Sequence, residues 1–188
     1  MADTGDINVG SVIRFNGELV QVIDWQHRTP GNLRAFYQAK MRNLINGKQT
    51  ENRFRSGELV DVVRVEYKQM QYIYSENDFA VVMDPETFEQ IHLNMSMFGD
   101  SAKFLKENMD VKVVFEGGET PILAEAPTFI EAQITYAEPG VKGDTATNTL
   151  KPAKIDTGTE VMVPLFVNEG DWIKVDTRTG GYVERIKK

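Results

Sequence analysis

Strand-type alternation broken by turn dipeptides is the feature that most constrains this chain of 188 residues. Segment 34–42 alternates most clearly. One face would carry Ala35, Tyr37, Ala39 and Met41, and the other Arg34, Phe36, Gln38, Lys40 and Arg42. Asn16-Gly17 and Asn46-Gly47 are dipeptides that favour tight turns between antiparallel strands. The pattern therefore predicts small antiparallel sheets.

The same strand-type pattern extends along the whole chain. Strands are expected over residues 9–15, 19–25, 35–44, 59–67, 79–83, 111–115, 122–125, 129–136, 160–167, 172–176 and 182–186. One convincing helix is expected, capped by Asp100 or Ser101 and running to about Asn108. About five strands and one short helix in some 60 residues are typical of an OB-type barrel. We therefore predict an all-β fold of three small barrels in series, spanning residues 1–64, 65–127 and 128–188.

Composition and charge narrow the function classes. The chain has no cysteine, which fits a cytosolic protein, and a polar, acidic first ten residues unlike a secretory signal. No stretch approaches the roughly 18 apolar residues of a membrane helix. The net charge is −7, but residues 1–64 hold nine Lys/Arg against seven Asp/Glu, whereas residues 65–127 hold four against twelve. A surface that contacts phosphates is therefore expected on the first third, unless the small domains differ in charge by chance.

Catalytic chemistry has no visible basis in the sequence. His27 and His92 lie in different expected domains, and no zinc-type ligand spacing accompanies them. No glycine-rich phosphate loop, nucleophile elbow or dinucleotide fingerprint is present. We expect no catalytic residue, no metal site and no cofactor.

The connection over residues 28–34 and the C-terminal third stand out. In the connection, Pro30-Gly31 pre-sets a tight turn between two long strands, which would hold it away from the barrel as a stiff finger. An ordinary hairpin, and a merely solvated basic strand face beside it, remain alternatives. The C-terminal third carries the run Val163-Pro164-Leu165-Phe166-Val167 and the run Lys174-Val175-Asp176-Thr177-Arg178.

These C-terminal runs resemble the signature of bacterial translation elongation factor P. Further segments fit the same family pattern: Lys40-Met41-Arg42-Asn43-Leu44, Phe54, Glu86-Thr87-Phe88-Glu89-Gln90, Gly99-Asp100-Ser101-Ala102-Lys103, Pro139-Gly140-Val141-Lys142-Gly143-Asp144-Thr145 and Lys151-Pro152-Ala153. The resemblance covers essentially the whole chain. The third domain separates it from the two-domain eukaryotic and archaeal counterparts.

The resemblance implies a KOW-type barrel followed by two OB-fold barrels, elongated and tRNA-like in outline, in a monomeric, cytoplasmic protein that is not an enzyme. It implies binding to the bacterial ribosome and its RNA beside the peptidyl-tRNA, where stalled bonds such as those at consecutive prolines are accelerated. The tip loop, formed by Pro30, Gly31, Asn32, Leu33 and Arg34, would reach the tRNA acceptor end. Gly143, Asp144 and Thr145 would lie near the messenger RNA in the exit site. Candidate contacts to RNA phosphates are Arg28, Arg34, Lys40 and Arg42.

The fingertip departs from the family pattern. Members usually carry there a Lys or Arg that is often enzymatically extended, but this sequence has Asn32, which has no amine or guanidinium. Three interpretations remain open. Asn32 acts unmodified through its amide, Arg34 supplies the cation, or the chain is a divergent member with altered activity. The competing function is a ribosome-associated RNA-binding module that relieves no proline stall.

Overall fold

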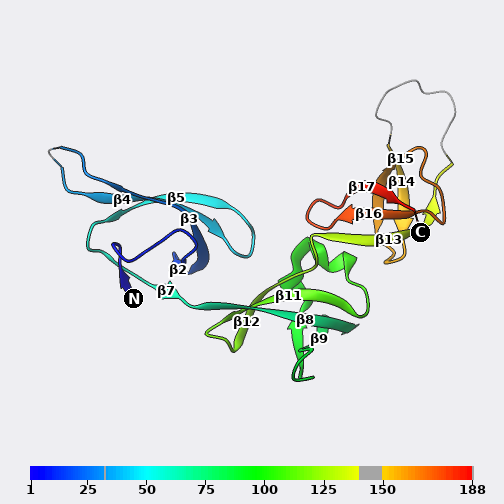
Figure 1. The fold of residues 1–188 in the computed structure, drawn as a ribbon, viewed down its shortest axis with the longest axis horizontal. Coiled ribbons are helices and arrows are strands. Elements are labelled where there is room, and N and C mark those ends of the chain that lie inside the picture. The colour runs from blue at the N-terminus through cyan, green and yellow to red at the C-terminus, as the bar shows by residue number, and fades with distance from the viewer. Residues whose placement is uncertain (32, 140–149, 188) are drawn as a thin grey trace. The chain divides into compact units, whose positions relative to one another are not determined.

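A computed structural model describes residues 1–31, 33–139 and 150–187 of the chain (Figure 1). Asn32 and the predicted exit-site residues Gly143, Asp144 and Thr145 lie outside these residues. The described part is built almost entirely from β-strands, with one short helical segment. The predicted all-β class is therefore confirmed. No helix of the described residues is long and apolar enough to cross a membrane.

The N-terminal region forms a five-stranded and a two-stranded sheet. Its strands are β1 (Ala2–Asp3), β2 (Val12–Phe15), β3 (Glu18–Arg28), β4 (Phe36–Asn43), β5 (Gln49–Arg55), β6 (Leu59–Val60) and β7 (Val62–Val63). The larger sheet has the order β5-β4-β3-β2-β7, and β1 pairs with β6. Ala39 and Met41 are fully buried, as the alternation predicts. Asn16 and Gly17 both have positive φ, the geometry of the expected hairpin turn.

Two strand predictions in this region were too long. The strand expected to start at Val9 begins at Val12, because residues 8–11 turn first and Ser11 N–H donates to the Asn8 carbonyl. The strand expected over residues 59–67 divides because its parts pair with different partners. Leu59–Val60 pair with β1, whereas Val62–Val63 pair with β2.

The central region forms a second five-stranded sheet. Its strands are β8 (Val65–Glu76), β9 (Phe79–Met83), β10 (Gln90–Asn94), β11 (Met109–Glu116) and β12 (Thr120–Glu125), in the order β10-β9-β8-β11-β12. Met70 and Tyr72 are buried, but Tyr74 is exposed. The register of β8 against β9 shifts between Tyr72 and Tyr74, which interrupts the alternation of buried and exposed side chains along β8.

The helix differs from its prediction. It is a 3-10 helix, η1 (Met95–Phe104), capped by Asn94, whose side chain accepts from the Ser96 N–H. The expected caps were wrong, because the helical segment starts earlier and is kinked at Gly99, where φ is +53°. It also ends at Phe104 and not near Asn108. Phe104 is fully buried in the core of the C-terminal region.

The C-terminal region forms the third five-stranded sheet. Its strands are β13 (Phe129–Ala137), β14 (Leu150–Ile155), β15 (Glu160–Pro164), β16 (Trp172–Asp176) and β17 (Gly181–Ile186), in the order β15-β14-β13-β16-β17. The strand predicted to end at Val167 ends at Pro164, where Val167 N–H closes a turn onto the Pro164 carbonyl. The core of this sheet includes Ile134, Ile155 and Ile173.

Contacts within the chain define two compact units. One comprises Met1–Tyr67 with Val114–Leu123, and the other Lys68–Val113 with Ala124–Lys188. The predicted three domains, with boundaries after residues 64 and 127, stay a prediction, and so does the expected tRNA-like outline.

Candidate functional site

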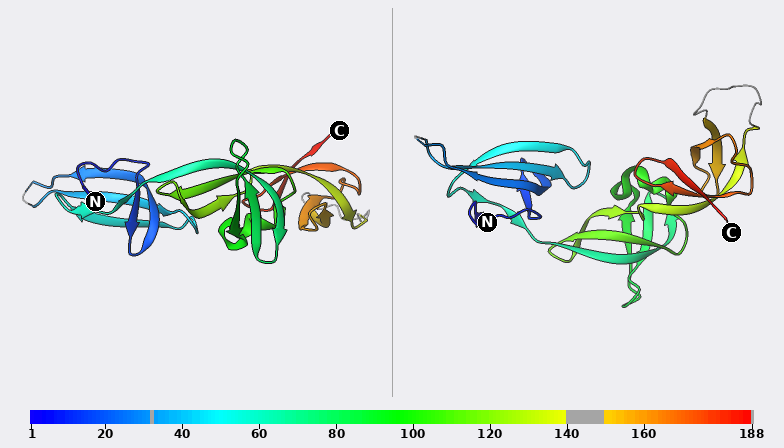
Figure 2. Two further views of the ribbon diagram at one scale, coloured as in Figure 1. Left: turned by 90° about the horizontal axis from the view of Figure 1, so that it is seen from below. Right: turned by 45° about the horizontal axis from the view of Figure 1, so that its top comes forward.

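The ribbon formed by β3, β4 and β5 carries the predicted finger. Arg28 pairs with Phe36 at the end of β3 and β4, and Phe36 pairs in turn with Arg55 of β5. Figures 1 and 2 show these strands running side by side, with the connection at the end of the ribbon. Seven residues, 29–35, join the last paired residues of β3 and β4. The expected tip loop therefore follows directly from a three-stranded support.

Aromatic side chains brace the face of this ribbon that covers the core. The Trp25 and Tyr37 rings stack with centroids 5.4 Å apart, and His27 lies 4.7 Å from Tyr37. Trp25 also contacts Phe54 at 5.3 Å, and its indole N–H donates to the Thr4 carbonyl at 3.2 Å. Such contacts between rings restrict the motion of the strands that carry them. They give the base of the finger a fixed orientation within its unit.

The opposite face of the ribbon is polar, and we call it the polar face. Its side chains form cross-strand rows, one from each of β3, β4 and β5. From the tip inward, the rows are Arg28-Phe36-Arg55, Gln26-Gln38-Arg53, Asp24-Lys40-Glu51 and Gln21-Arg42-Gln49. The three rows nearest the tip line a shallow hollow of about 430 Å³, to which all their members except Arg55 contribute.

Hydrogen bonds join side chains of the polar face both between neighbouring rows and within one row. On β3, Arg28 Nη2 donates to Gln26 Oε1 at 2.8 Å, and Gln26 Nε2 donates to Asp24 Oδ2 at 2.9 Å. Across β4 and β5, Arg53 Nε donates to Gln38 Oε1 at 3.0 Å. These bonds hold long, exposed side chains in fixed positions.

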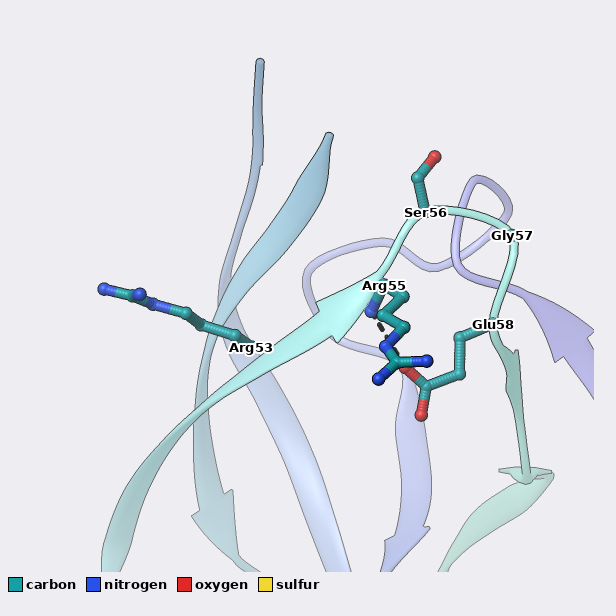
Figure 3. Close-up of a pocket in the computed structure, with 5 residues that line it drawn as sticks. All are labelled: Arg53, Arg55, Ser56, Gly57 and Glu58. Atoms are coloured by element: carbon teal, nitrogen blue, oxygen red, sulfur yellow. Dashed lines mark hydrogen bonds between the residues drawn. The ribbon is translucent and has the colours of Figure 1, made fainter. Parts of the chain in front are cut away.

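A second hollow lies at the end of β5. It measures about 610 Å³ and is lined by Arg53, Arg55, Ser56, Gly57 and Glu58. Figure 3 shows Arg53 extending to one side of β5, whereas Arg55 lies beside Glu58. The Glu58 carboxylate accepts from the Arg55 backbone N–H at 2.8 Å, as the dashed line in Figure 3 marks. Arg53 therefore borders both hollows.

The predicted tip residues lie beyond the paired strands. Gly31 and Arg34 are exposed, Pro30 is half-buried, and Leu33 is 75% exposed. The Leu33 N–H donates to the Pro30 carbonyl at 3.1 Å, a β-turn bond that agrees with the turn expected from Pro30-Gly31. The tip thus presents an exposed apolar and an exposed cationic side chain.

The predicted phosphate contacts on the strands share the polar face but differ in surroundings. Arg28 is held by neutral Gln26, as described above. Lys40 Nζ lies 3.4 Å from the Glu51 carboxylate, so a neighbouring negative charge partly compensates its own. Arg42 is exposed one row further from the tip.

Sequence reasoning missed the two arginines of β5. Segment 49–55 is polar except for Phe54, so no strand was expected there, and Arg53 and Arg55 received no role. The signal was nevertheless present. Thr50, Asn52 and Phe54 alternate with Gln49, Glu51, Arg53 and Arg55, and Phe54 is buried.

The chemistry of the described residues offers no metal centre. No group of three or more His, Asp or Glu residues among them is arranged to hold a metal ion. The polar face instead offers guanidinium and amide donors, which suit oxygen acceptors such as phosphates.

Family models match three consecutive parts of the chain. The elongation factor P KOW-like domain matches residues 3–60, the elongation factor P OB domain residues 65–123, and the elongation factor P C-terminal domain residues 130–185. Among solved structures, a translation initiation factor eIF-5A family protein from Naegleria fowleri matches with a TM-score of 0.54 at 14% identity. That match covers 66% of this chain and 93% of the other, and it supports the fold alone.

Full-length relatives are similar over the whole chain. Elongation factor P of Chloroherpeton thalassium is 48% identical over 188 residues, covering 100% of both chains. Elongation factor P of Clostridium botulinum strain Eklund 17B is 47% identical, covering 99% of this chain and 100% of the relative. Elongation factor P of a Roseiflexus species, strain RS-1, is 46% identical and covers 100% of both. The chain therefore belongs to the elongation factor P family, whose members are translation factors and not enzymes.

Proposed function

We propose that the chain binds the bacterial ribosome beside the peptidyl-tRNA and accelerates difficult peptide bonds, notably at consecutive prolines. Family membership supports a ribosome-associated translation elongation factor. The observation that carries the finer proposal is the braced β3–β4 ribbon, whose aromatic stack fixes the base of an exposed tip.

The mechanism is positioning. Prolyl donors and acceptors react slowly because they hold the reacting groups in poor geometry. A stiff tip against the tRNA acceptor end restricts that end to productive arrangements, which reduces the ordering left for the transition state. Such a factor needs no general base of its own. The described tip residues accordingly offer contacts and no titrating pair.

The remaining contacts follow from the same arrangement. We assign Arg28, Arg34, Lys40 and Arg42 to phosphates of tRNA or ribosomal RNA, and the segment Gly143 to Thr145 to the messenger RNA in the exit site. In this proposal the protein acts as a cytoplasmic monomer. Its KOW-type domain ends near residue 64, and its central OB-fold ends near residue 127.

The tip residue decides how the factor acts. We propose that Asn32 works unmodified, because its amide both donates and accepts hydrogen bonds and can therefore contact the tRNA end directly. Arg34, which is exposed, is the alternative source of a tip contact. These two assignments predict different sensitive residues.

A reconstituted bacterial translation system tests the proposal. A reporter with three consecutive prolines is translated with unmodified recombinant protein, and Asn32→Ala and Arg34→Ala are compared with the wild type. Stall relief by the wild type, lost in Asn32→Ala, supports the assignment. Loss only in Arg34→Ala moves the tip contact to the arginine. Failure of the wild type on its cognate ribosomes contradicts the proposal.

The divergent tip also fits one competing function. An RNA-binding module that associates with ribosomes without promoting peptide bonds would also keep the polar face and dispense with a tip cation. Ribosome pelleting separates the two functions when it is combined with the stall assay. A module that pellets with ribosomes but leaves the stall unchanged fits the competing function.

A further inference from the structure

The polar face holds two of its arginines in a way that leaves their charges available. Arg28 and Arg53 come from different strands and line the same hollow of about 430 Å³. Each donates to a glutamine side-chain oxygen, Arg28 to Gln26 and Arg53 to Gln38. Because a glutamine is neutral, these bonds fix the guanidinium groups without neutralising them. Neither arginine makes an ion pair with another described residue.

The two glutamines are themselves positioned. Gln26 and Gln38 are cross-strand partners of β3 and β4, so their side chains are neighbours on the polar face. Gln26 Nε2 donates to Asp24 at 2.9 Å, and Gln38 Nε2 lies 3.4 Å from Glu51 as a weaker donor. The carboxylates therefore orient the amides, and the amides orient the guanidinium groups. A neutral glutamine therefore lies between each carboxylate and its arginine: Gln26 between Asp24 and Arg28, and Gln38 between Glu51 and Arg53.

Arg53 is fixed by a second contact. Its guanidinium lies over the Phe36 ring, 5.2 Å from the ring centroid, while Nε is held by Gln38. Its two terminal nitrogens make no hydrogen bond within the described part of the chain. A planar guanidinium that is already ordered binds a phosphate at lower entropic cost than a freely rotating side chain.

Lys40 and Arg55 provide the contrast. Lys40 Nζ pairs with Glu51 at 3.4 Å, and Arg55 lies beside Glu58 in Figure 3. The Glu51 carboxylate would compete with an incoming phosphate for Lys40, whereas the Glu58 carboxylate accepts from the Arg55 backbone N–H. Of the three cations that line the 430 Å³ hollow, Arg28 and Arg53 are therefore the two without a carboxylate partner among the described residues.

We propose that Arg28 and Arg53 form a two-guanidinium cradle for the RNA sugar-phosphate backbone, with Gln26 and Gln38 as positioning residues. The cradle deepens the proposed function and rests on it, since the RNA in question is that of the ribosome or its bound tRNA. Paired guanidinium forks suit phosphate oxygens, which accept two parallel hydrogen bonds from one arginine. The cradle reads no base and gives no sequence preference.

The test measures binding of N-terminally labelled protein to 70S ribosomes with a tRNA in the peptidyl site, over about 50 to 200 mM salt. Arg53→Gln is expected to weaken binding about tenfold and to lower the slope of log affinity against log salt by about one. Lys48→Gln removes one charge from the exposed connection between β4 and β5, outside the hollow, and is the matched control. It is expected to weaken binding less than about twofold.

Gln38→Leu tests positioning separately from charge. It keeps Arg53 charged but removes the acceptor that holds Nε, so binding should weaken about threefold while the salt slope stays that of the wild type. Arg53→Lys should restore the slope but not the full affinity, because an ammonium neither forks nor stacks in the same way. Thermal unfolding of the Arg53 variants should match the wild type, since Arg53 is exposed.

The outcomes separate the cradle from the proposed function. If the wild type binds and Arg53→Gln weakens binding no more than Lys48→Gln, only total charge matters and the cradle is wrong. An unchanged affinity in Gln38→Leu removes the positioning role. If the wild type relieves no proline stall but Arg53→Gln still weakens binding as expected, the proposed function fails and the cradle stands. If the wild type does not bind the ribosome at all, both fail.

Discussion

Arg28 and Arg53 on the polar face of the N-terminal unit are held differently from Lys106, two residues after Phe104 in the other unit. On the polar face, Arg28 and Arg53 donate to neutral glutamines. Beside Phe104, Lys106 Nζ donates to the Asp156 carboxylate and to the Glu131 carbonyl, each at 2.7 Å. In the first arrangement the positive charge stays available to an external anion, whereas in the second a carboxylate within the fold neutralises it. The type of partner, and not the number of cations, separates a binding surface from a structural contact.

The aromatic residues of the two regions show the same contrast. Phe36 is half-buried beneath the Arg53 guanidinium on the polar face. Phe104, at the end of η1, is fully buried among β13 to β17 residues, including Ile134, Ile155 and Ile173. Both rings have a cation over them, since Lys103 Nζ lies 5.2 Å from the Phe104 centroid, but only Phe104 fills a core. Substitutions in the two regions should accordingly affect binding in one case and stability in the other.

The largest effect is expected from Phe104→Ala. Removing a fully buried ring leaves a cavity, so the free energy of unfolding should fall by about 3–5 kcal/mol. Urea unfolding followed by circular dichroism measures it. Phe166→Ala, at a ring that is 58% exposed, is the control and should change stability by less than about 0.5 kcal/mol. Equal effects of the two substitutions would show that Phe104 is no core residue.

A pair of lysine substitutions compares an exposed ion pair on the polar face with a more buried one in the other unit. Lys106→Met strands the Asp156 carboxylate, whose side chain is only 31% exposed, and should lower stability by about 1–3 kcal/mol. Lys40→Met breaks an ion pair between side chains that are 50% and 58% exposed, and should cost about 0–0.5 kcal/mol. Urea unfolding of both variants provides the comparison. Similar costs for the two would remove the distinction between the regions.

Sequence patterns predicted best the strands whose two faces differ most in hydrophobicity. In β4 the alternation correctly assigned Ala39 and Met41 to the core and left Lys40 and Arg42 exposed. Phe79–Met83 and Trp172–Asp176 are strands with the predicted bounds, because each is a short apolar-rich run. Family membership, read from the C-terminal signature, is also confirmed.

Other elements depend on partners that a local pattern does not reveal. β5 was missed because its polar sequence becomes a strand through pairing with β4. The helix boundary was wrong because Phe104 ends the helical segment to fill the core of a sheet that begins 25 residues later. The cradle was missed for the same reason, since Gln38 and Arg53 meet only across strands. The tip and exit-site assignments stay predictions.

Thr4 is a buried residue of the N-terminal unit that holds the turn after β5. Its buried hydroxyl accepts from the Gly57 N–H at 3.0 Å and donates to the Arg55 carbonyl at 3.2 Å, which fixes the turn after β5. Thr4→Val keeps the shape but leaves the Gly57 N–H unpaired, so stability should fall by about 1–2 kcal/mol in thermal unfolding. Thr4→Ser, which keeps the hydroxyl, should retain more of that stability. A larger loss in the serine variant would mean that the methyl group, and not the hydroxyl, matters.

The smallest effect concerns the titration of Asp176. Side-chain hydrogen bonds from Arg178, at 2.7 and 3.0 Å, lower the pKa of this carboxyl below its usual value of 3.8, and the Arg178 backbone N–H adds to the shift. A carboxyl whose folded pKa is depressed stabilises the fold above the unfolded pKa. That stability is lost as the pH falls through the folded pKa.

Arg178→Gln should therefore raise the Asp176 pKa toward its ordinary value and reduce the loss of stability on acidification. Carboxyl carbon chemical shifts, followed from about pH 5 down to about pH 1, measure the change. Asp84 is the internal control, because backbone N–H groups of Glu86 and Thr87 lower its pKa and the substitution does not touch them. If the Asp176 pKa stays low in Arg178→Gln, the backbone bond alone sets it. The Arg178 side chain would then contribute nothing to the titration of Asp176, and the contrast between the two units would not extend to this residue.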